Sequence, residues 1–349
     1  MISYILPIRN EFGFIEKTLQ SILSQNNGKD FEILVADGMS DDGTREIVKE
    51  FQKRNSYIIL INNLEKIVST GFNRALSIAK GNVIIRVDGH SILGNNFTQH
   101  CLNAFEKVDA VCVGGATEHV AFGFIGSSIK IAQSSIFGVG GVAFRQGLIG
   151  GEFVDTLAFG AYKREVFDQL GGYDEELVRN QDDEFNFRLI QNGGKIWLDP
   201  SIKSSYTPRN SFIGLFKQYF QYGFYKVRVM QKRRGFASWR HLVPGLFVSS
   251  ILLSFFIYFL NGNLFSFKLI FIPYIVISLG FTVIAFFKSP NKILSVFLLP
   301  FTFFILHFSY GLGFLSGLVW FWNKWGDTEV KDSHFVFEKF KSNFESKIL

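Results

Sequence analysis

Apolar and polar positions follow two different patterns along this chain, and the pattern changes near residue 210. Before it, short runs of apolar residues are separated by segments with helical periodicity. The runs predict strands at Ile2–Ile8, Phe31–Ala36, Ser56–Ile61 and Asn82–Val87, and the periodic segments predict helices at Phe12–Ser24, Thr44–Lys53 and Ser69–Ala79. This alternation predicts an α/β domain with a largely parallel sheet.

The second pattern is nearly continuous apolarity. Between Leu242 and Asn323 there is no Asp or Glu and only three Lys, and apolar runs occupy Leu242–Leu260, Leu269–Phe287 and Ile293–Trp322. Because about 20 helical residues cross the hydrocarbon core of a bilayer, we interpret the runs as about three transmembrane helices. The third run could instead form an interfacial helix, Ile293–Phe304, followed by a span.

Charge suggests how this part is oriented. The segment from Pro200 to Arg240 carries nine Lys or Arg and no acid, mixed with Phe and Tyr. The positive-inside rule therefore predicts a multi-pass protein of the cytoplasmic membrane whose N-terminal domain faces the cytoplasm. The tail after Asn323 carries no charge bias. Three full spans would place it outside, whereas two spans and an interfacial helix would place it inside.

The predicted organisation is an α/β domain at 1–210, a basic and aromatic membrane-interface segment at 211–241, a transmembrane region at 242–323 and a polar tail at 324–349. At 48% hydrophobic residues, the 349-residue chain is too apolar to be mainly disordered. Its two cysteines cannot form a disulfide framework. The net charge of +6 is concentrated near the membrane end, so we expect membrane lipids and not nucleic acid as a partner.

Three polar clusters follow predicted strands or begin predicted helices. The first runs from Asp37 to Thr44, D-G-M-S-D-D-G-T. Taken alone, it indicates a strand–turn–helix junction with acids at the start of the helix. The second, R-V-D-G-H, places Asp88 and His90 two residues apart after a strand. A carboxylate and an imidazole can hold a divalent cation, although turn chemistry explains such a pair equally well.

The third cluster, Q-D-D-E at residues 181–184, begins a predicted helix. Glu184 and Arg188 are four residues apart and can form an ion pair. This pairing leaves Asp182 and Asp183 as uncommitted acids, unless the cluster is only a solvated helix start.

Taken together, five motifs in this order resemble the family 2 glycosyltransferases of GT-A fold: P-x-R-N-E at residues 7–11, D-G-x-S-x-D-G-T at 37–44, D-x-H at 88–90, G-G-Y-D-E at 171–175 and D-x-E-F-x-x-R-L at 182–189. The match covers residues 1–210, and it is most similar to the succinoglycan-biosynthesis type of membrane-attached bacterial transferases. It implies a mixed, mainly parallel sheet with flanking helices.

The resemblance also implies roles for individual residues. Pro7, Arg9, Asn10, Glu11 and Asp37 would line the nucleoside pocket, and Asp88 would bind the donor diphosphate. Asp88 and His90 would hold Mg²⁺ or Mn²⁺, and Asp182 would be the catalytic carboxylate. Gln181 departs from the acid usual at its position.

Further residues are assigned on the acceptor side. Asp183 is a second candidate there. The Gly-rich stretch from Phe122 to Arg145 is either a surface loop with a buried helix or a lid whose Arg145 faces a phosphate, since a guanidinium donates two hydrogen bonds at once.

The resulting hypothesis is a membrane-anchored, metal-dependent, inverting hexosyltransferase. It would move a sugar from a nucleotide-sugar donor to a polyprenyl-phosphate-linked saccharide acceptor in polysaccharide or glycolipid synthesis. One alternative is a processive polysaccharide synthase, although the expected Q-x-x-R-W reads Q-K-R-R-G at 231–235. The other is a catalytically inactive membrane scaffold of the same fold.

Overall fold

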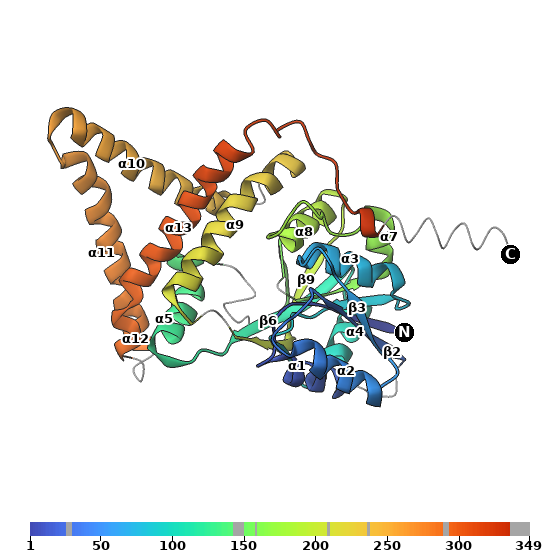
Figure 1. The fold of residues 1–349 in the computed structure, drawn as a ribbon. Coiled ribbons are helices and arrows are strands. Elements are labelled where there is room, and N and C mark those ends of the chain that lie inside the picture. Colours follow the sequence, from blue (N-terminus) through green and yellow to red (C-terminus); the bar gives the residue numbers. More distant parts are fainter. Residues whose placement is uncertain are drawn as a thin grey trace. The chain divides into compact units, whose positions relative to one another are not determined.

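A computed structural model describes residues 1–25, 30–141, 150–157, 159–207, 210–235, 238–288 and 293–335. The chain forms two compact units (Figure 1). Unit 1 comprises Met1–Glu118, Gly147–Tyr206 and Glu329–Leu349, and unit 2 comprises His119–Gln146 and Thr207–Thr328. The chain therefore leaves unit 1 twice and returns to it twice.

Unit 1 begins with the alternation that the sequence predicts. Its first elements are β1 (Ile2–Ile8), α1 (Ile15–Leu23), β2 (Phe31–Asp37), α2 (Thr44–Arg54), β3 (Ile58–Asn62), α3 (Val68–Ile78) and β4 (Val83–Arg86). They are followed by β5 (Ser91–Leu93), α4 (Phe97–Lys107), β6 (Cys112–His119), β7 (Glu152–Phe153), β8 (Gly160–Lys163), α7 (Arg164–Leu170), α8 (Gln181–Gln191) and β9 (Ile196–Tyr206). The predicted strands and helices are confirmed, with ends shifted by up to three residues.

The strands of the described residues form one mixed sheet in the order β3-β2-β1-β4-β8-β6-β9-β5, with β7 paired to β9. The first four strands are parallel, and β4 pairs with β8 in the antiparallel sense. Every residue of β1 is buried, because helices cover both faces of a parallel sheet. The parallel arrangement brings the carboxyl ends of β1, β2 and β4 to one edge, and the predicted fold class is confirmed.

Unit 2 is helical. It contains α5 (Gly123–Gln133), α6 (Ile136–Val139), α9 (Phe212–Arg233), the 3₁₀-helix Trp239–His241, α10 (Val243–Asn261), α11 (Phe265–Lys288), α12 (Ile293–Phe297) and α13 (Leu299–Trp320). Three helices of the described part are long and apolar enough to cross a membrane: Trp239–Asn261, Phe265–Lys288 and Leu299–Trp320. The third predicted run is interrupted after Phe297, so the short α12 precedes a separate long helix.

Helices α9 and α13 pack along each other, and glycines allow their backbones to approach. A Cβ placed on Gly313 of α13 would lie 2.0 Å from the Phe220 carbonyl oxygen, and one on Gly223 of α9 would lie 2.0 Å from the Tyr310 carbonyl oxygen. Only glycine fits such distances without movement of the backbone. The two helices therefore depend on specific glycines for their contact.

We expect Gly313→Ala to lower the stability of unit 2 by about 1–3 kcal/mol or more, because the added methyl group overpacks the α9–α13 contact. Thermal unfolding in detergent, followed by circular dichroism, measures the effect. Gly280→Ala in α11 is the matched control, since its Cβ would meet no atom within 4 Å. Equal unfolding temperatures for the two variants would contradict the packing described here.

Candidate active site

Three loops meet at the carboxyl edge of the parallel strands. They follow β1, β2 and β4, and each carries one of the motifs singled out in the sequence. Ligands of open α/β sheets bind at this edge, outside the carboxyl ends of the strands. The topology therefore gathers the candidate residues of these three loops at one edge of the sheet in unit 1.

The loops after β1 and β2 are joined through Asn10. Its side-chain amide donates to Asp41 Oδ1 at 2.9 Å, and its backbone N–H donates to Ser40 Oγ at 2.9 Å. Asn10 has a φ of 56°, a left-handed conformation that asparagine tolerates better than most residues. Pro7 and Arg9 flank the end of β1, where Pro7 lies beside Ala36 of β2. The predicted nucleoside-binding residues are thus neighbours of the D-G-M-S turn.

Asp37 is fully buried at the end of β2 and is held by its own loop. Arg45 of α2 donates to Asp37 Oδ2 at 2.7 Å, and the Ser40 hydroxyl donates to Oδ1 at 2.5 Å. Arg45 also donates to the side-chain oxygen of Asn62 at the end of β3. The carboxylate predicted to face the nucleoside is therefore fixed by two side chains that the sequence analysis did not assign.

The most informative contact joins β4 to α8. Arg86, the last residue of β4, donates from Nη2 to Asp88 Oδ1 and from Nη1 to Asp182 Oδ2, both at 2.9 Å. The Arg86 side chain is 7% exposed, whereas those of Asp88 and Asp182 are 24% and 31% exposed. One guanidinium thus holds the two carboxylates, which are 94 residues apart, at the surface of the site.

The electrostatics of this bridge follow from its burial. Burial alone would lower the pKa of the Arg86 guanidinium, but the charges of Asp88 and Asp182 raise that pKa well above its usual value. Arg86 is therefore a permanent cation between two acids. Asp182 is not an uncommitted acid, so this part of the sequence interpretation is wrong: packing of α8 against the end of β4 pairs it with Arg86.

The remaining acids of the third cluster behave differently. Glu184 and Arg188 form the predicted ion pair at 3.0 Å, fully inside the protein. Arg188 also donates to the Gly172 carbonyl oxygen at 2.7 Å, which joins α8 to the G-G-Y-D-E motif. Asp183 lies in the first turn of α8, and its backbone N–H donates to Asp182 Oδ1 at 2.9 Å. Both residues therefore lie in the first turn of α8, and the Asp182 carboxylate accepts from the backbone of that turn.

His90 is oriented by Glu11. His90 Nδ1 lies 2.8 Å from Glu11 Oε1, which connects the loop after β4 to the loop after β1. Gly89 makes the approach possible, because a Cβ there would lie 2.7 Å from the Glu11 Cγ. A histidine that binds a metal commonly makes such a bond to a carboxylate through its other nitrogen. Both residues are predicted from the sequence to belong to the site, and their contact is not evident from their spacing of 79 residues.

The residues predicted to bind a divalent cation suit one in their chemistry. Asp88 uses Oδ1 for Arg86, and His90 uses Nδ1 for Glu11. Within the described ranges no group of three or more His, Cys, Asp or Glu could hold a metal ion. Mg²⁺ typically takes one or two carboxylates and completes its shell with water and substrate phosphates. The pair therefore fits a cation that binds together with a diphosphate.

Arg145, the predicted phosphate-facing residue, lies outside the described residues. Arg86 is the main residue that sequence reasoning missed. A signal for it exists, since a charged residue at the end of the buried strand V-I-I-R lies on the same face of the chain as Asp88 two positions later.

Residues 3–171 match the family model described as glycosyl transferase family 2. The part of the chain that carries most of the predicted site residues therefore matches a family of glycosyltransferases, and the resemblance drawn from the motifs is confirmed.

Two relatives are similar over most of the chain. The succinoglycan biosynthesis protein ExoA of Rhizobium meliloti (strain 1021) is 28% identical over 242 residues, which are 69% of this chain and 73% of the relative. The second relative, from Methanococcus voltae, is the dolichyl N-acetyl-alpha-D-glucosaminyl phosphate 3-beta-D-2,3-diacetamido-2,3-dideoxy-beta-D-glucuronosyltransferase. It is 29% identical over 330 residues, which are 91% of this chain and 97% of the relative.

A solved structure shares the fold. The mannosyltransferase PcManGT from Pyrobaculum calidifontis, determined in complex with GDP-Man and Mn²⁺, superposes with a TM-score of 0.58. The match covers 93% of this chain and 87% of that protein at 16% sequence identity. This likeness supports the fold alone.

Proposed function

We propose that the protein is an inverting, metal-dependent glycosyltransferase that moves a sugar from a nucleotide-sugar donor to a lipid-linked saccharide acceptor. The observation that carries the proposal is the Arg86 bridge. It holds Asp88, assigned to the donor diphosphate, and Asp182, assigned to the acceptor, on one guanidinium. A carboxylate for each partner of a transfer reaction thus lies at the same edge of the sheet.

The donor half of the reaction uses the loops after β1, β2 and β4. Arg9, Asn10 and Asp37 would bind the nucleoside, and Asp88 with His90 would hold Mg²⁺ or Mn²⁺ against the diphosphate. A bound divalent cation acts as a Lewis acid that stabilises the negative charge of the departing nucleoside diphosphate. Glu11 keeps the His90 imidazole in a fixed orientation through its 2.8 Å contact.

The acceptor half of the reaction uses Asp182 as general base. The acceptor hydroxyl must lose its proton as its oxygen attacks C1 of the sugar, and a carboxylate within hydrogen-bond reach takes that proton. The new bond forms on the face of C1 opposite the bond to the diphosphate, so the configuration at C1 is inverted. Asp183, the next residue in the first turn of α8, is the second acidic residue that we assign to the acceptor side.

The lipid-linked nature of the acceptor is supported by the membrane helices and by the relatives. The name of the Methanococcus voltae relative gives a dolichyl-phosphate-linked sugar as its acceptor, and that of the Rhizobium meliloti relative gives succinoglycan biosynthesis. We extend from these a polyprenyl-phosphate-linked acceptor and a role in polysaccharide or glycolipid synthesis. The basic segment before α10 favours a catalytic unit that faces the cytoplasm.

The test is the release of nucleoside diphosphate by the purified protein in detergent, measured across a panel of UDP-, GDP- and dTDP-sugars with Mn²⁺ or Mg²⁺. We expect release from one donor above all others, accelerated by a polyprenyl-phosphate-linked saccharide, and its loss on chelation with EDTA. Readdition of the metal restores it. Release from no donor would support the inactive scaffold, and a long polymer as product would support a processive synthase.

A further inference from the structure

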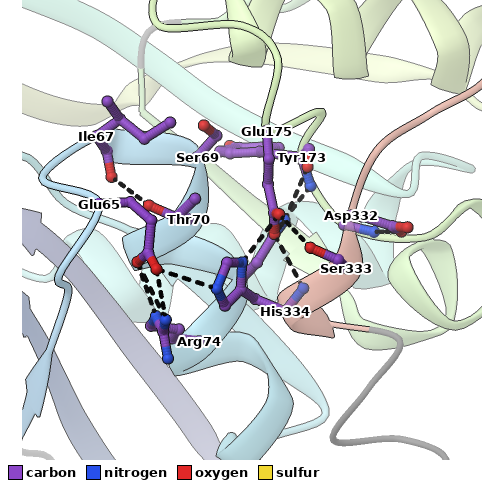
Figure 2. Close-up of polar contacts among 12 residues, drawn as sticks. Glu65, Ile67, Ser69, Thr70, Arg74, Tyr173, Glu175, Asp332, Ser333 and His334 are labelled. Atoms are coloured by element: carbon purple, nitrogen blue, oxygen red, sulfur yellow. Dashed lines mark hydrogen bonds and ion pairs between the residues drawn. The ribbon is translucent and has the colours of Figure 1, made fainter.

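The chain returns to the catalytic unit after its last membrane helix. Residues Glu329–Phe335, the return segment, are part of unit 1. Figure 2 shows how Glu175 of the G-G-Y-D-E motif binds this segment: His334 Nδ1 lies 2.9 Å from Glu175 Oε2, and the Ser333 hydroxyl donates to the same oxygen at 2.8 Å. The return segment is therefore attached by specific side-chain contacts.

Further contacts anchor the return segment on both sides of Glu175. The Gly172 backbone N–H donates to Asp332 Oδ2 at 2.8 Å, and His334 Nε2 lies 3.4 Å from Glu65 Oε1 (Figure 2). The Phe335 side chain is buried. A segment held this way lies on the same side of the membrane as the sheet. The chain must therefore cross the bilayer an even number of times between Tyr206 and Glu329.

Among the residues that the structure describes, three helices are long and apolar enough to cross, and three is an odd number. An even number would result if α9 were a fourth crossing. The relative direction of α9 and α13 tests this possibility. In a chain that crosses four times, at α9, α10, α11 and α13, the first and the fourth helix run in opposite directions through the membrane. Whether α9 and α13 run the same way therefore decides the topology.

Helices α9 and α13 run in the same direction. Near the start of α9, Phe212 contacts Phe301 at the start of α13. Further along, Gly223 lies against Tyr310, and Arg228 pairs with Asp327, which follows α13. The residue numbers of the partners therefore increase together along the two segments. The parallel course is visible in Figure 1. Four crossings are therefore excluded, and α9 also carries five Lys or Arg, which makes it a poor membrane span.

The beginning of α13 is also tied to a segment that does not cross. The Ser128 hydroxyl of α5 lies 2.7 Å from the Thr302 hydroxyl of α13, and Ile129 belongs to one apolar cluster with Phe303. With 11 residues α5 is too short to span a bilayer, and its excursion from unit 1 ends at Gln146. Both ends of α13 are thus joined to segments that stay on the same side of the bilayer as unit 1.

We propose that only α10 and α11 cross the bilayer, and that α9 and α13 form an interfacial platform on the leaflet that faces the catalytic unit. The partner of this platform is the headgroup layer of the lipid. Most residues of α10 and α11 face away from the protein, whereas half of the α13 span is buried. Trp320 and Trp322, 73% and 72% exposed near Lys324, are residues typical of the membrane–water interface.

Labelling with a membrane-impermeant maleimide tests the topology in sealed membrane vesicles of known orientation. Single cysteines are placed in unit 1 by Lys53→Cys, in the α10–α11 turn by Leu264→Cys, and after α13 by Gly326→Cys. Gly326 offers open space, since its Cβ would meet no atom within 4 Å. The native Cys101 and Cys112 are fully buried, so the unmodified protein gives the background.

We expect the cysteines at 53 and 326 to react from the same side, at least tenfold faster than from the other, and the cysteine at 264 to react from the opposite side. Reaction at 326 from the side of 264 would overturn the proposal. Asn323→Cys is an independent reporter of the same end if Gly326→Cys does not fold. The labelling does not depend on turnover, so its failure is distinct from failure of the proposed function.

Discussion

Asp182→Asn is expected to reduce kcat on the order of 10²–10⁴-fold, the range that a general base contributes. Asparagine keeps an oxygen that can accept the hydrogen bond from Arg86, so the bridge to β4 persists in part. What disappears is the ability to take a proton from the acceptor hydroxyl. Donor affinity, measured as the KM for the nucleotide sugar, should change by less than about threefold. Initial rates at saturating acceptor provide the measurement.

Asp183→Asn is the matched control, because it makes the same change one residue later in the first turn of α8. We expect it to keep more than a tenth of the activity. If Asp182→Asn turns over within tenfold of the unmodified enzyme while Asp183→Asn is inactive, the base is Asp183. Loss of nucleotide-sugar binding in Asp182→Asn would instead assign Asp182 to the donor.

The fold could be predicted where the local pattern is strong. The run from Ile2 to Ile8 is buried along its whole length, and such a run has few alternatives to a central strand. The apolar runs of the membrane end are also long and uniform, so they predict their helices directly. One alternative interpretation of the third run places a break after Phe304, whereas the helix breaks after Phe297. The composition is apolar on both sides of the break and does not fix its position. A hydrophobic run predicts that a helix is apolar, and it does not say whether that helix crosses the bilayer.

The site could be predicted only in part. Strand ends in a parallel sheet share one edge, so the loops bearing Asp37 and Asp88 were expected to meet. The partner of each carboxylate depends on contacts between residues distant in sequence, such as Arg86 with Asp182, 96 positions apart. Pairing rules based on spacing found Glu184 with Arg188, four residues apart, but cannot find such a contact. The same reason hid the bond between Glu175 and His334.

Arg86→Lys is expected to lower kcat by about 10- to 100-fold with little change in the KM for the donor. A lysine ammonium is a point charge, whereas the planar guanidinium donates to Asp88 and Asp182 at once from two nitrogens. The lysine would keep a positive charge near both acids but would no longer fix their positions. Because catalysis depends on the orientation of the base, a small displacement of Asp182 affects turnover more than binding.

Arg86→Met removes the charge and leaves two carboxylates facing each other in a partly buried site. We expect this variant to lose activity beyond detection and to unfold at a lower temperature, since breaking a buried ion pair by removing one partner costs about 3–5 kcal/mol. Arg74→Lys is the control, because Arg74 pairs with Glu65 at the surface of the same unit.

Guanidinium ion added at millimolar concentration should partly restore the kcat of Arg86→Lys if Arg86 positions the two acids. Full activity in Arg86→Lys would show that the bridge is not needed to orient Asp182, and equal losses in kcat and donor affinity would assign Arg86 to substrate binding.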